Sequence, residues 1–332
     1  GEWSEGWRAC LESRIAQRIL VVMGRNPVSD ADQLYEAARE IPWTDFLTSQ
    51  QTLSVNCVAV GSALRHSGFV ALRVKDAIVD QVRDLEGERP SIDREDPDVR
   101  VFVYLANNKA TFYLDMSGQP LHLRGYREKS GDAPLRENLA AAILRMSGWD
   151  QKTPLIDPMC GSGTLAIEAA QWAARLAPGL SRDRFGFERW NNFDEEMMQS
   201  VRQLRGELRA AATGQKPSIV ARDNDGEVLD IAKANSRIAG VQLSFKNQSI
   251  LDLQSDGPAR TLVTNPPYGK RLSSDDEFLG KMGAVIRRLH GWRVAILSGS
   301  SNIERAIKIP PINSIPLVNG DLDCQLLIYQ ID

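Results

Sequence analysis

One segment of the chain combines an acid, two glycines and a hydroxyl at a spacing suited to holding a small ligand. It is DPMCGSGT, residues 157–164, between an apolar run that ends at Asp157 and a helical pattern that begins at Thr164. Gly161 and Gly163 permit a sharp turn and let a ligand approach the backbone closely. The N–H groups at the start of a helix can donate to a polar ligand. The segment therefore predicts a ligand-binding loop between a strand and a helix.

Two classes of cofactor have to be weighed for this loop. Gly161, Gly163 and Ala166 satisfy the loose G-x-G-x-x-A pattern of dinucleotide-binding proteins. Asp157 would repel a pyrophosphate, however, and the strand-end acid Asp223 follows Gly161 by 62 residues, where that pattern expects an acid after roughly 20. An acid before the loop favours a cationic ligand without phosphate. A nicotinamide-dependent oxidoreductase is thus the weaker alternative.

A second segment, ARDND at residues 221–225, ends another apolar run. A carboxylate at a strand end, here Asp223, can accept hydrogen bonds from both hydroxyls of a ribose. Asn224 or Asp225 can instead cap the helix that follows. Both roles are compatible, because Asp223 still belongs to the strand. The segment predicts an acid that binds a nucleoside.

A third segment, TNPPYG at residues 264–269, has groups for a planar amine. Pro266 and Pro267 remove two N–H donors and stiffen the backbone after a strand. The side-chain oxygen of Asn265 and a nearby backbone carbonyl can then accept both protons of an –NH2 group. Tyr268 offers a flat face on which a ring can stack. The predicted catalytic residues are therefore Asn265, Pro266, Pro267 and Tyr268.

Together these motifs resemble the Rossmann-like S-adenosylmethionine-dependent methyltransferases that act on amino groups, which include adenine-N6 DNA methyltransferases. Longer segments are similar to a narrower family, the bacterial 23S rRNA guanine-N2 methyltransferases with a THUMP domain. In the second part of the chain these are DPMCGSGTLAIEAA, APLRENLAAAIL, TNPPYGKRL and NGDLDCQLLIY. In the first part they are KDAIVDQVR, RPSIDREDPDVRV and LDMSGQPLHLRGYR. The resemblance covers nearly the whole chain.

The resemblance implies a cofactor, a product and a set of site residues. The cofactor would be S-adenosyl-L-methionine, leaving S-adenosyl-L-homocysteine, and the product N2-methylguanosine in 23S rRNA. Backbone around Arg136 and Glu137 would complete the pocket. The implied cofactor-binding residues are Asp157, Met159, Cys160, Gly161, Ser162, Gly163, Thr164, Asp223, Asn224, Ser249, Ile250 and Asn265.

The sequence departs from the family pattern in three places. Ser249, in NQSI, stands where methyltransferases usually carry an acid for the adenine amino group of the cofactor. By the resemblance, the chain holds only the end of the family's ferredoxin-like segment, and it ends at Asp332, where members often continue into a second methyltransferase domain. Two other interpretations stay open: a tRNA guanine-N2 methyltransferase, and an inactive RNA-binding protein.

The elements that must position these motifs predict two domains. Residues 1–127 read as mixed helix and strand, and the resemblance implies that they form an α+β THUMP-type RNA-binding domain with the end of a ferredoxin-like segment. They include predicted strands at 52–60, 99–105 and 109–114, a helix at 69–85, and a helix-spaced pattern at 8–23 running into a possible strand. Residues 131–332 alternate strands and helices, which predicts a Rossmann-like α/β domain with a mostly parallel sheet and a closing antiparallel hairpin. Ligands of such sheets bind outside the carboxyl ends of the strands.

Composition sets the broad class. The 332 residues are 42% hydrophobic and 25% charged, which is typical of a folded globular protein. No apolar run approaches the roughly 18 residues of a membrane span. The four cysteines form no CxxC pair, so we expect no disulfide framework, no metal site and a cytoplasmic location. The chain begins without Met, which suggests a fragment.

Charge restricts how the chain can contact RNA. The formal net charge is −3, whereas dedicated nucleic-acid binders usually carry a basic surplus. We therefore expect contacts with RNA through local patches, the RNA being 23S rRNA or an assembly intermediate, with tRNA as the alternative. We also expect a monomer. The candidate contacts are Arg124, Arg127, Lys129, Lys270 and Arg271.

Overall fold

The computed structural model describes residues 1–127, 135–214, 217–255, 258, 260–267 and 276–332. They divide into two compact units. The first comprises Gly1–Leu123 and Arg182–Glu207, and the second Arg124–Ser181 and Leu208–Asp332. The sequence places a boundary between residues 127 and 131, most of which lies outside the described residues. The structure differs from that division in grouping residues 182–207 with the first unit.

The first unit is built on a five-stranded sheet with the order β1-β5-β4-β2-β3. Strands β2, β4 and β5 and helix α3 confirm the predicted elements within a few residues. The elements are α1 (Trp3–Glu12), β1 (Leu20–Pro27), α2 (Ala31–Arg39), β2 (Thr52–Val60), α3 (Ser67–Glu86), β3 (Ser91–Ile92), β4 (Val99–Ala106) and β5 (Lys109–Asp115), with 3-10 turns at Trp43–Asp45 and Gly186–Arg189.

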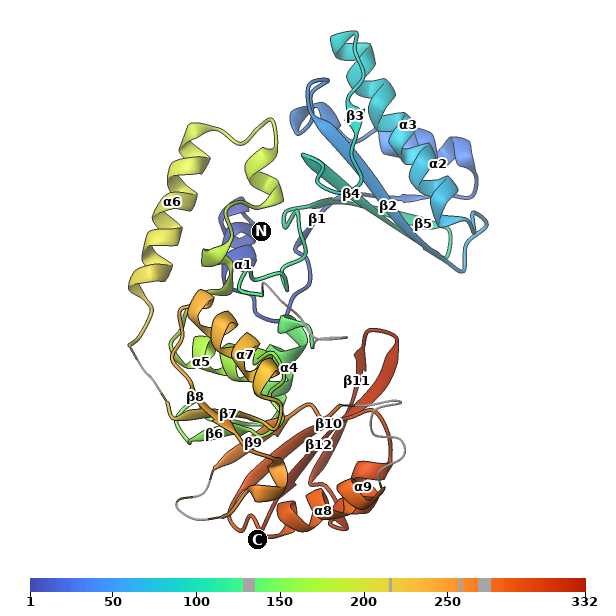
Figure 1. The fold of residues 1–332 in the computed structure, drawn as a ribbon. Helices are drawn as coiled ribbons and strands as arrows, with labels where there is room; N and C mark the ends of the chain where they lie inside the picture. Colours follow the sequence, from blue (N-terminus) through green and yellow to red (C-terminus); the bar gives the residue numbers. More distant parts are fainter. Residues whose placement is uncertain (128–134, 215–216, 256–257, 259, 268–275) are drawn as a thin grey trace. The chain divides into compact units, whose positions relative to one another are not determined.

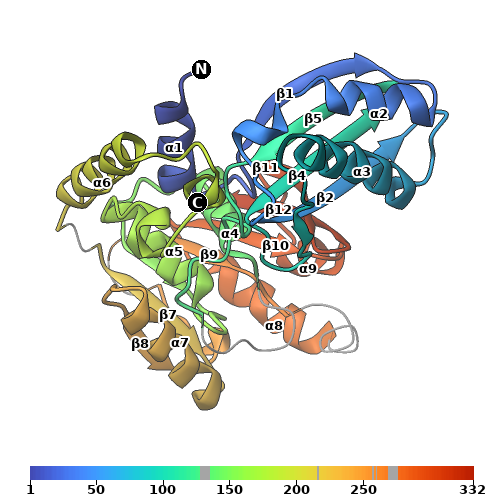
Figure 2. The same ribbon diagram turned by 90° about the horizontal axis from the view of Figure 1, so that it is seen from above.

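Helices α2 and α3 cover one face of this sheet (Figure 1 and Figure 2). Alternate residues of β4, from Val99 to Leu105, are buried, because successive side chains of a strand point to opposite faces. Helix α3 buries Val70, Val74 and Ile78, which recur every four residues along one helical stripe. The core of the unit therefore lies between the two helices and the sheet.

The helix-spaced pattern at residues 8–23 is divided in the structure. Helix α1 ends at Glu12, and the chain is extended again from Leu20 in β1. Strand β1 pairs antiparallel with β5, with Leu20 opposite Asp115. The predicted change from a helix to a strand is therefore confirmed, whereas the pairing of β1 with a strand almost a hundred residues away cannot be read from the local pattern.

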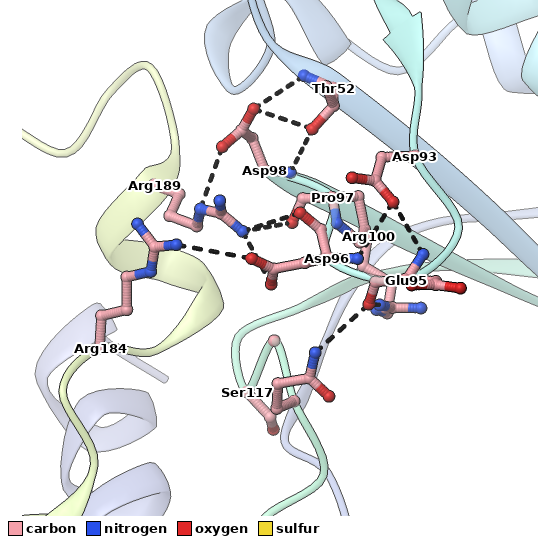
Figure 3. A network of polar contacts seen from close by, with 12 residues as sticks. Thr52, Asp93, Glu95, Asp96, Pro97, Asp98, Arg100, Ser117, Arg184 and Arg189 are labelled. Atoms are coloured by element: carbon pink, nitrogen blue, oxygen red, sulfur yellow. Dashed lines mark hydrogen bonds and ion pairs between the residues drawn. The ribbon is translucent and has the colours of Figure 1, made fainter.

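Residues 182–207 join the first unit through a polar network (Figure 3). The Arg189 guanidinium donates to the backbone oxygens of Asp96 and Pro97 at 3.1 and 3.0 Å. The same group lies 3.0 Å from a carboxylate oxygen of Asp98. Asp98 in turn accepts hydrogen bonds from the backbone and hydroxyl of Thr52 at 2.8 and 2.9 Å. One arginine thus ties this segment to the loop before β4.

An aromatic cluster completes that attachment. The Trp190 ring lies 5.7 Å from the ring of Trp3 and 5.6 Å from that of Phe46. The rings of Trp7 and Phe187 are 6.1 Å apart. Burial of large aromatic side chains is the dominant favourable term in such packing, so these contacts explain why the segment groups with the first unit.

The second unit contains a seven-stranded sheet with the order β11-β12-β10-β9-β6-β7-β8. The run from β8 to β10 is parallel, whereas β12 pairs antiparallel with both β10 and β11. This confirms the predicted fold class. The elements are α4 (Glu137–Met146), β6 (Leu155–Asp157), α5 (Thr164–Ala173), β7 (Ile219–Asp223), α7 (Gly226–Ile238), β8 (Ser244–Asn247), β9 (Thr261–Thr264), α8 (Asp276–Arg287), β10 (Arg293–Ser298), α9 (Asn302–Ile307), β11 (Asn313–Asn319) and β12 (Leu322–Gln330), with 3-10 turns at Pro178–Ser181 and Ile250–Asp252. Helix α6 (Glu195–Ala210) runs from the first unit into the second.

Helices cover both faces of this sheet. Helices α4, α5 and α7 lie on one face, and α8 and α9 lie on the other (Figure 1). From β6 the chain builds outward through β7 to β8 and then returns to the other side of β6 as β9. Ligands of open α/β sheets bind at such a switch point, beyond the carboxyl ends of the strands. No helix in the described ranges is long and apolar enough to cross a membrane.

Candidate active site

The glycine loop after β6 is shaped by two residues with positive φ. Gly161 has φ +51° and Gly163 has φ +88°, a region that L side chains rarely adopt. A Cβ on Gly163 would lie 3.1 Å from the Cβ of Ala232 in α7, whereas a Cβ on Gly161 would meet nothing within 4 Å. The loop is therefore packed against α7 at Gly163 and leaves room for a ligand at Gly161.

Hydrogen bonds from the neighbouring strand and helix fix the loop. The Asp223 carboxylate accepts from the N–H of Gly161 at 2.9 Å and from that of Asp225 at 3.1 Å. The buried Asn235 side chain donates to the Ser162 carbonyl at 3.0 Å. The N–H of Cys160 donates to the Arg222 carbonyl at 2.8 Å. Each carboxylate oxygen has two lone pairs, so Asp223 keeps acceptor capacity for ribose hydroxyls.

Asp157 at the end of β6 is buried, with 1% of its surface exposed. Its carboxylate accepts from the Thr264 hydroxyl at 2.9 Å and from the N–H of Met159 at 3.4 Å. Burial raises the pKa of Asp157 to about 7, the bond from Thr264 opposes that rise, and the charge of Asp223 adds to it. The carboxylate thus joins the ends of β6 and β9 across the switch point.

The predicted amine site begins directly after β9. All four residues of β9 are buried, Asn265 is half-buried, Pro266 is buried and Pro267 is exposed. The carboxyl end of β9 therefore presents the Asn-Pro-Pro segment at the same edge of the sheet as Asp157 and the glycine loop. Tyr268, Lys270 and Arg271, like Lys129, lie outside the described residues, so their roles stay predictions.

The remaining predicted cofactor residues lie around the ends of β6, β7 and β8. Ser249 caps the short turn at 250–252 by accepting from the N–H of Leu251 at 3.2 Å. Ile250 is 2% exposed and packs in the core beneath the site. Asn224 is exposed, and Met159 is half-buried. Ser249 thus has a local structural role, and its hydroxyl can still donate a hydrogen bond.

Cys160 is a packed side chain of the loop. It is 7% exposed and belongs to the core shared by α4, α5 and α7. Burial, together with the charges of Asp157 and Asp223, raises the pKa of its thiol. Nucleophilic cysteines need a lowered pKa, so the environment of Cys160 is the opposite of a catalytic one. The ranges that the structure describes contain no cluster of His, Cys, Asp and Glu suited to a metal ion.

Two residues expected to contact RNA are instead engaged inside the second unit. Arg124 is 2% exposed, with its Nε 3.4 Å from Glu168. Arg127 pairs with Glu137 at 3.1 Å and donates to the Leu135 carbonyl at 2.8 Å. Burying these guanidiniums requires such partners. Arg124 and Arg127 therefore have partners within the chain, and their contacts with RNA stay a prediction.

Arg127 also reaches the glycine loop. Its Nη2 donates to the Thr164 hydroxyl at 3.1 Å, at the first residue of α5. The same side chain thus joins the segment before α4 to the end of the loop. Sequence reasoning missed this role, as it missed Asn235 and Ala232. Asn235 lies three residues after Ala232 on the buried face of α7, and a polar residue on an apolar stripe is a usable signal for a buried hydrogen bond.

A cavity of about 640 Å³ opens beyond the carboxyl end of β10. Its lining includes Ser298, Glu304, Cys324 and Gln325. Strand β10 pairs in parallel with β9, with Ile296 beside Thr264. The cavity therefore lies one strand beyond the Asn-Pro-Pro segment, and its volume is in the range of small-molecule sites.

Two parts of the sequence match known domain families. Residues 124–328 match the RMKL-like methyltransferase domain, and residues 28–115 match the THUMP domain. The chain belongs to the RMKL-like methyltransferase family. It is 40% identical over 345 residues to the ribosomal RNA large subunit methyltransferase K/L of Syntrophotalea carbinolica, covering 100% of this chain and 48% of that protein. It spans about half the length of the curated relatives it matches.

Two solved structures share the fold of this chain over its whole length. SMU.472, solved as a complex with SAH, has a TM-score of 0.88 and 29% identity, covering 100% of this chain and 89% of that one. A predicted N6-adenine-specific DNA methylase from Listeria monocytogenes has a TM-score of 0.88 and 30% identity, covering 100% of this chain and 87% of that one. Together with the two family matches, these structures confirm the predicted fold class, in which a THUMP domain precedes a Rossmann-like methyltransferase domain.

Proposed function

We propose that the chain transfers the methyl group of S-adenosylmethionine to the exocyclic N2 amine of a guanosine in 23S rRNA. The observation that carries the proposal is the meeting of Asp157, Asp223 and Asn265 at the carboxyl ends of three adjacent strands, beside the open side of Gly161. The family match and the complex of SMU.472 with SAH support the cofactor. The K/L relatives support large-subunit rRNA as the substrate.

The glycine loop and Asp223 are proposed to hold the cofactor. The space beside Gly161 admits a ligand against the loop backbone, and Asp223 can accept from ribose hydroxyls. The other proposed contacts are Asp157, Met159, Cys160, Ser162, Gly163, Thr164, Asn224, Ser249, Ile250 and Asn265. S-adenosylmethionine, when bound, supplies an electrophilic methyl group on a sulfonium.

Asn265 and the Pro266 carbonyl are proposed to hold the guanine amine. This amine is conjugated with its ring and is a poor nucleophile. When Asn265 and the Pro266 carbonyl accept hydrogen bonds from its two protons, its lone pair turns toward the methyl group. The N–C bond would form as the S–C bond of the sulfonium breaks, which leaves S-adenosylhomocysteine, and the proton lost by the amine would pass to water. Pro266 and Pro267 keep these acceptors rigid, and a fixed near-attack geometry supplies much of the rate. Stacking on Tyr268 would hold the ring, and the base must first leave its own stack.

Substitutions at Asn265 and Asp223 separate the two steps. Asn265→Ala should abolish turnover on 23S rRNA while changing cofactor affinity by a few-fold at most. Asp223→Ala should weaken cofactor binding by about 10- to 150-fold, because a charged acceptor contributes about 1.5–3 kcal/mol. Calorimetry measures cofactor affinity, and single-turnover methylation measures the rate on 23S rRNA. Asn313→Ala and Asp230→Ala, at exposed positions, serve as controls.

The modified nucleoside decides between this proposal and its alternatives. Mass analysis should find N2-methylguanosine in 23S rRNA. N2-methylguanosine confined to tRNA would support the tRNA alternative, and N6-methyladenine in DNA would support the activity in the name of the Listeria relative. Wild-type single-turnover activity in Asn265→Ala would remove Asn265 from the site. We further propose that the protein acts as a monomer in the cytoplasm, where rRNA is assembled.

A further inference from the structure

The sheet of the first unit has a second face, opposite α2 and α3. Residues paired across neighbouring strands point to the same face. Strand register therefore places Val22, Tyr113 and Phe102 in one row and Thr111, Tyr104 and Val58 in the next. We call these two rows, with Arg25 and Lys109, the open face.

The open face presents aromatic rings to the surroundings. Tyr104 is 41% exposed, Val22 45% and Val58 42%. The rings of Phe102 and Tyr113, both half-buried, are 6.2 Å apart. Phe102 and Tyr104 are two residues apart on β4, which separates their rings by about 7 Å along the strand. The open face thus has exposed stacking surfaces at regular intervals, whereas the one aromatic ring of β5 on the covered face, Phe112, is fully buried.

The charge of the open face is opposite to that of the chain. The chain carries −3 in total, yet the five strands of this sheet contain a single acid, Asp115. Asp115 is 1% exposed and forms an ion pair with Arg18. Arg25 and Lys109 are exposed, and Arg25 is opposite Thr111 on this face. An anionic ligand therefore meets two exposed cations here and one acid whose charge is already paired.

We propose that the open face binds single-stranded RNA, with bases stacked on Tyr104, Phe102 and Tyr113 and phosphates at Arg25 and Lys109. The proposal rests on the proposed function, because it takes RNA as the substrate. Aromatic side chains accept any base because every base has a flat face, and basic residues follow the backbone. Sheets with exposed aromatic pairs bind unstacked RNA bases in this way in other folds.

Fluorescence anisotropy on the full chain tests the proposal. The probes are a labelled single-stranded RNA of about 12 nucleotides and a duplex of the same length. Tyr104→Ala should weaken binding of the single strand by about 5- to 150-fold, the equivalent of about 1–3 kcal/mol per stacked base. Tyr104→Phe should retain it. Arg25→Ala and Lys109→Ala should each lower the steepness of the log–log salt dependence by about 0.7.

The matched control is Phe69→Ala, which removes a ring that is 49% exposed on α3, the helix on the covered face. It should leave RNA affinity within twofold. Loss of affinity in Phe69→Ala with none in Tyr104→Ala would overturn the proposal and place RNA on the helices. Preference for the duplex would also overturn it. A dimer of the wild type, seen by light scattering, that the Tyr104→Ala substitution dissociates would also overturn the proposal, because the open face would then bind a second copy of the chain.

Cofactor affinity separates this proposal from the proposed function. All the open-face residues belong to the first unit and the cofactor loop to the second, so every variant should bind S-adenosylmethionine as the wild type does. Unchanged RNA affinity in Tyr104→Ala, in a protein that binds cofactor and methylates RNA, defeats the open-face proposal alone. A wild-type protein that binds RNA but no cofactor defeats the proposed function alone.

Discussion

Arg127 joins two segments of the cofactor site through one planar group. Its guanidinium contacts Glu137, the Leu135 carbonyl and the Thr164 hydroxyl, a fork that lysine cannot reproduce. Arg127→Met should lower the free energy of unfolding by about 3–5 kcal/mol, because it leaves the buried Glu137 carboxylate uncompensated. Arg127→Lys should lower it less, yet still weaken cofactor binding by displacing Thr164. Denaturant titration and calorimetry measure the two effects.

The control for Arg127 is Arg145→Lys, at an exposed position near the end of α4. It should change neither the free energy of unfolding nor the affinity for the cofactor. A lysine variant at residue 127 with wild-type cofactor affinity would show that Arg127 stabilises the fold without positioning the loop.

The Asp157 carboxyl should make stability depend on pH. Its pKa is about 7 in the folded state against an ordinary 3.8. Between these values the folded state holds a proton that the unfolded state has released, so the free energy of unfolding falls as pH rises. Asp157→Asn removes this dependence and keeps an acceptor for Thr264. The free energy of unfolding of the wild type minus that of the variant should fall by about 2–4 kcal/mol from pH 4 to pH 8.

Urea titrations of the cofactor-free protein at several pH values measure that difference. Other titrating groups cancel, since both proteins contain them. A difference that stays flat, or rises with pH, would mean that Asp157 is ionised in the folded protein.

At the scale of elements, two glycines of the loop between β6 and α5 have different roles. Gly163 packs against α7, and Gly161 leaves room for the ligand. Gly161→Ala should cost about 1–2 kcal/mol of stability, for its positive φ alone, but should weaken cofactor binding by tenfold or more by filling the open side. Gly163→Ala should cost more stability, because its Cβ also meets Ala232 at 3.1 Å. Adding Ala232→Gly to the Gly163→Ala variant should recover the part of the lost stability that comes from this steric contact.

Thermal unfolding and cofactor titration of the four proteins test this division. Equal losses of cofactor affinity in Gly161→Ala and Gly163→Ala, with equal losses of stability, would show that the loop responds as one rigid piece. Gly226→Ala in α7 is an unsuitable control, because its Cβ would lie 2.9 Å from the Asn247 side chain. Gly206→Ala in α6, with nothing within 4 Å, is a suitable one.

At the scale of the whole molecule, the two units are interleaved along the chain. Removing residues 1–125 alone would strip Trp3, Trp7 and Phe46 from Phe187 and Trp190. We expect that truncation to aggregate. Removing residues 1–123 and replacing 182–207 by a flexible linker should instead give a folded second unit that binds S-adenosylmethionine and does not methylate 23S rRNA.

Size-exclusion chromatography and calorimetry compare the two truncations. A monomeric, cooperatively folded product of the simple truncation would show that residues 182–207 do not depend on the first unit. Methylation of full-length rRNA by the second unit at the wild-type rate would show that the first unit is not needed to position the substrate.

The sequence by itself determined the local parts of this protein. The apolar runs before Asp157, Asp223 and Asn265 predicted the strands that end there, because strand period and glycine or proline punctuation are local properties. The same runs predicted the parallel sheet, and the motifs between them predicted the chemistry. The long helix α3 was equally readable from its apolar stripe.

Only the tertiary structure decided which distant residues meet. Arg124 and Arg127 look like surface cations in the sequence, and their partners Glu168 and Glu137 lie 44 and 10 residues away. The end of α1 and the place of residues 182–207 depend on pairing and packing with segments far along the chain. These outcomes are set by burial and by the cost of unpaired buried charge, which become defined when the chain is compact.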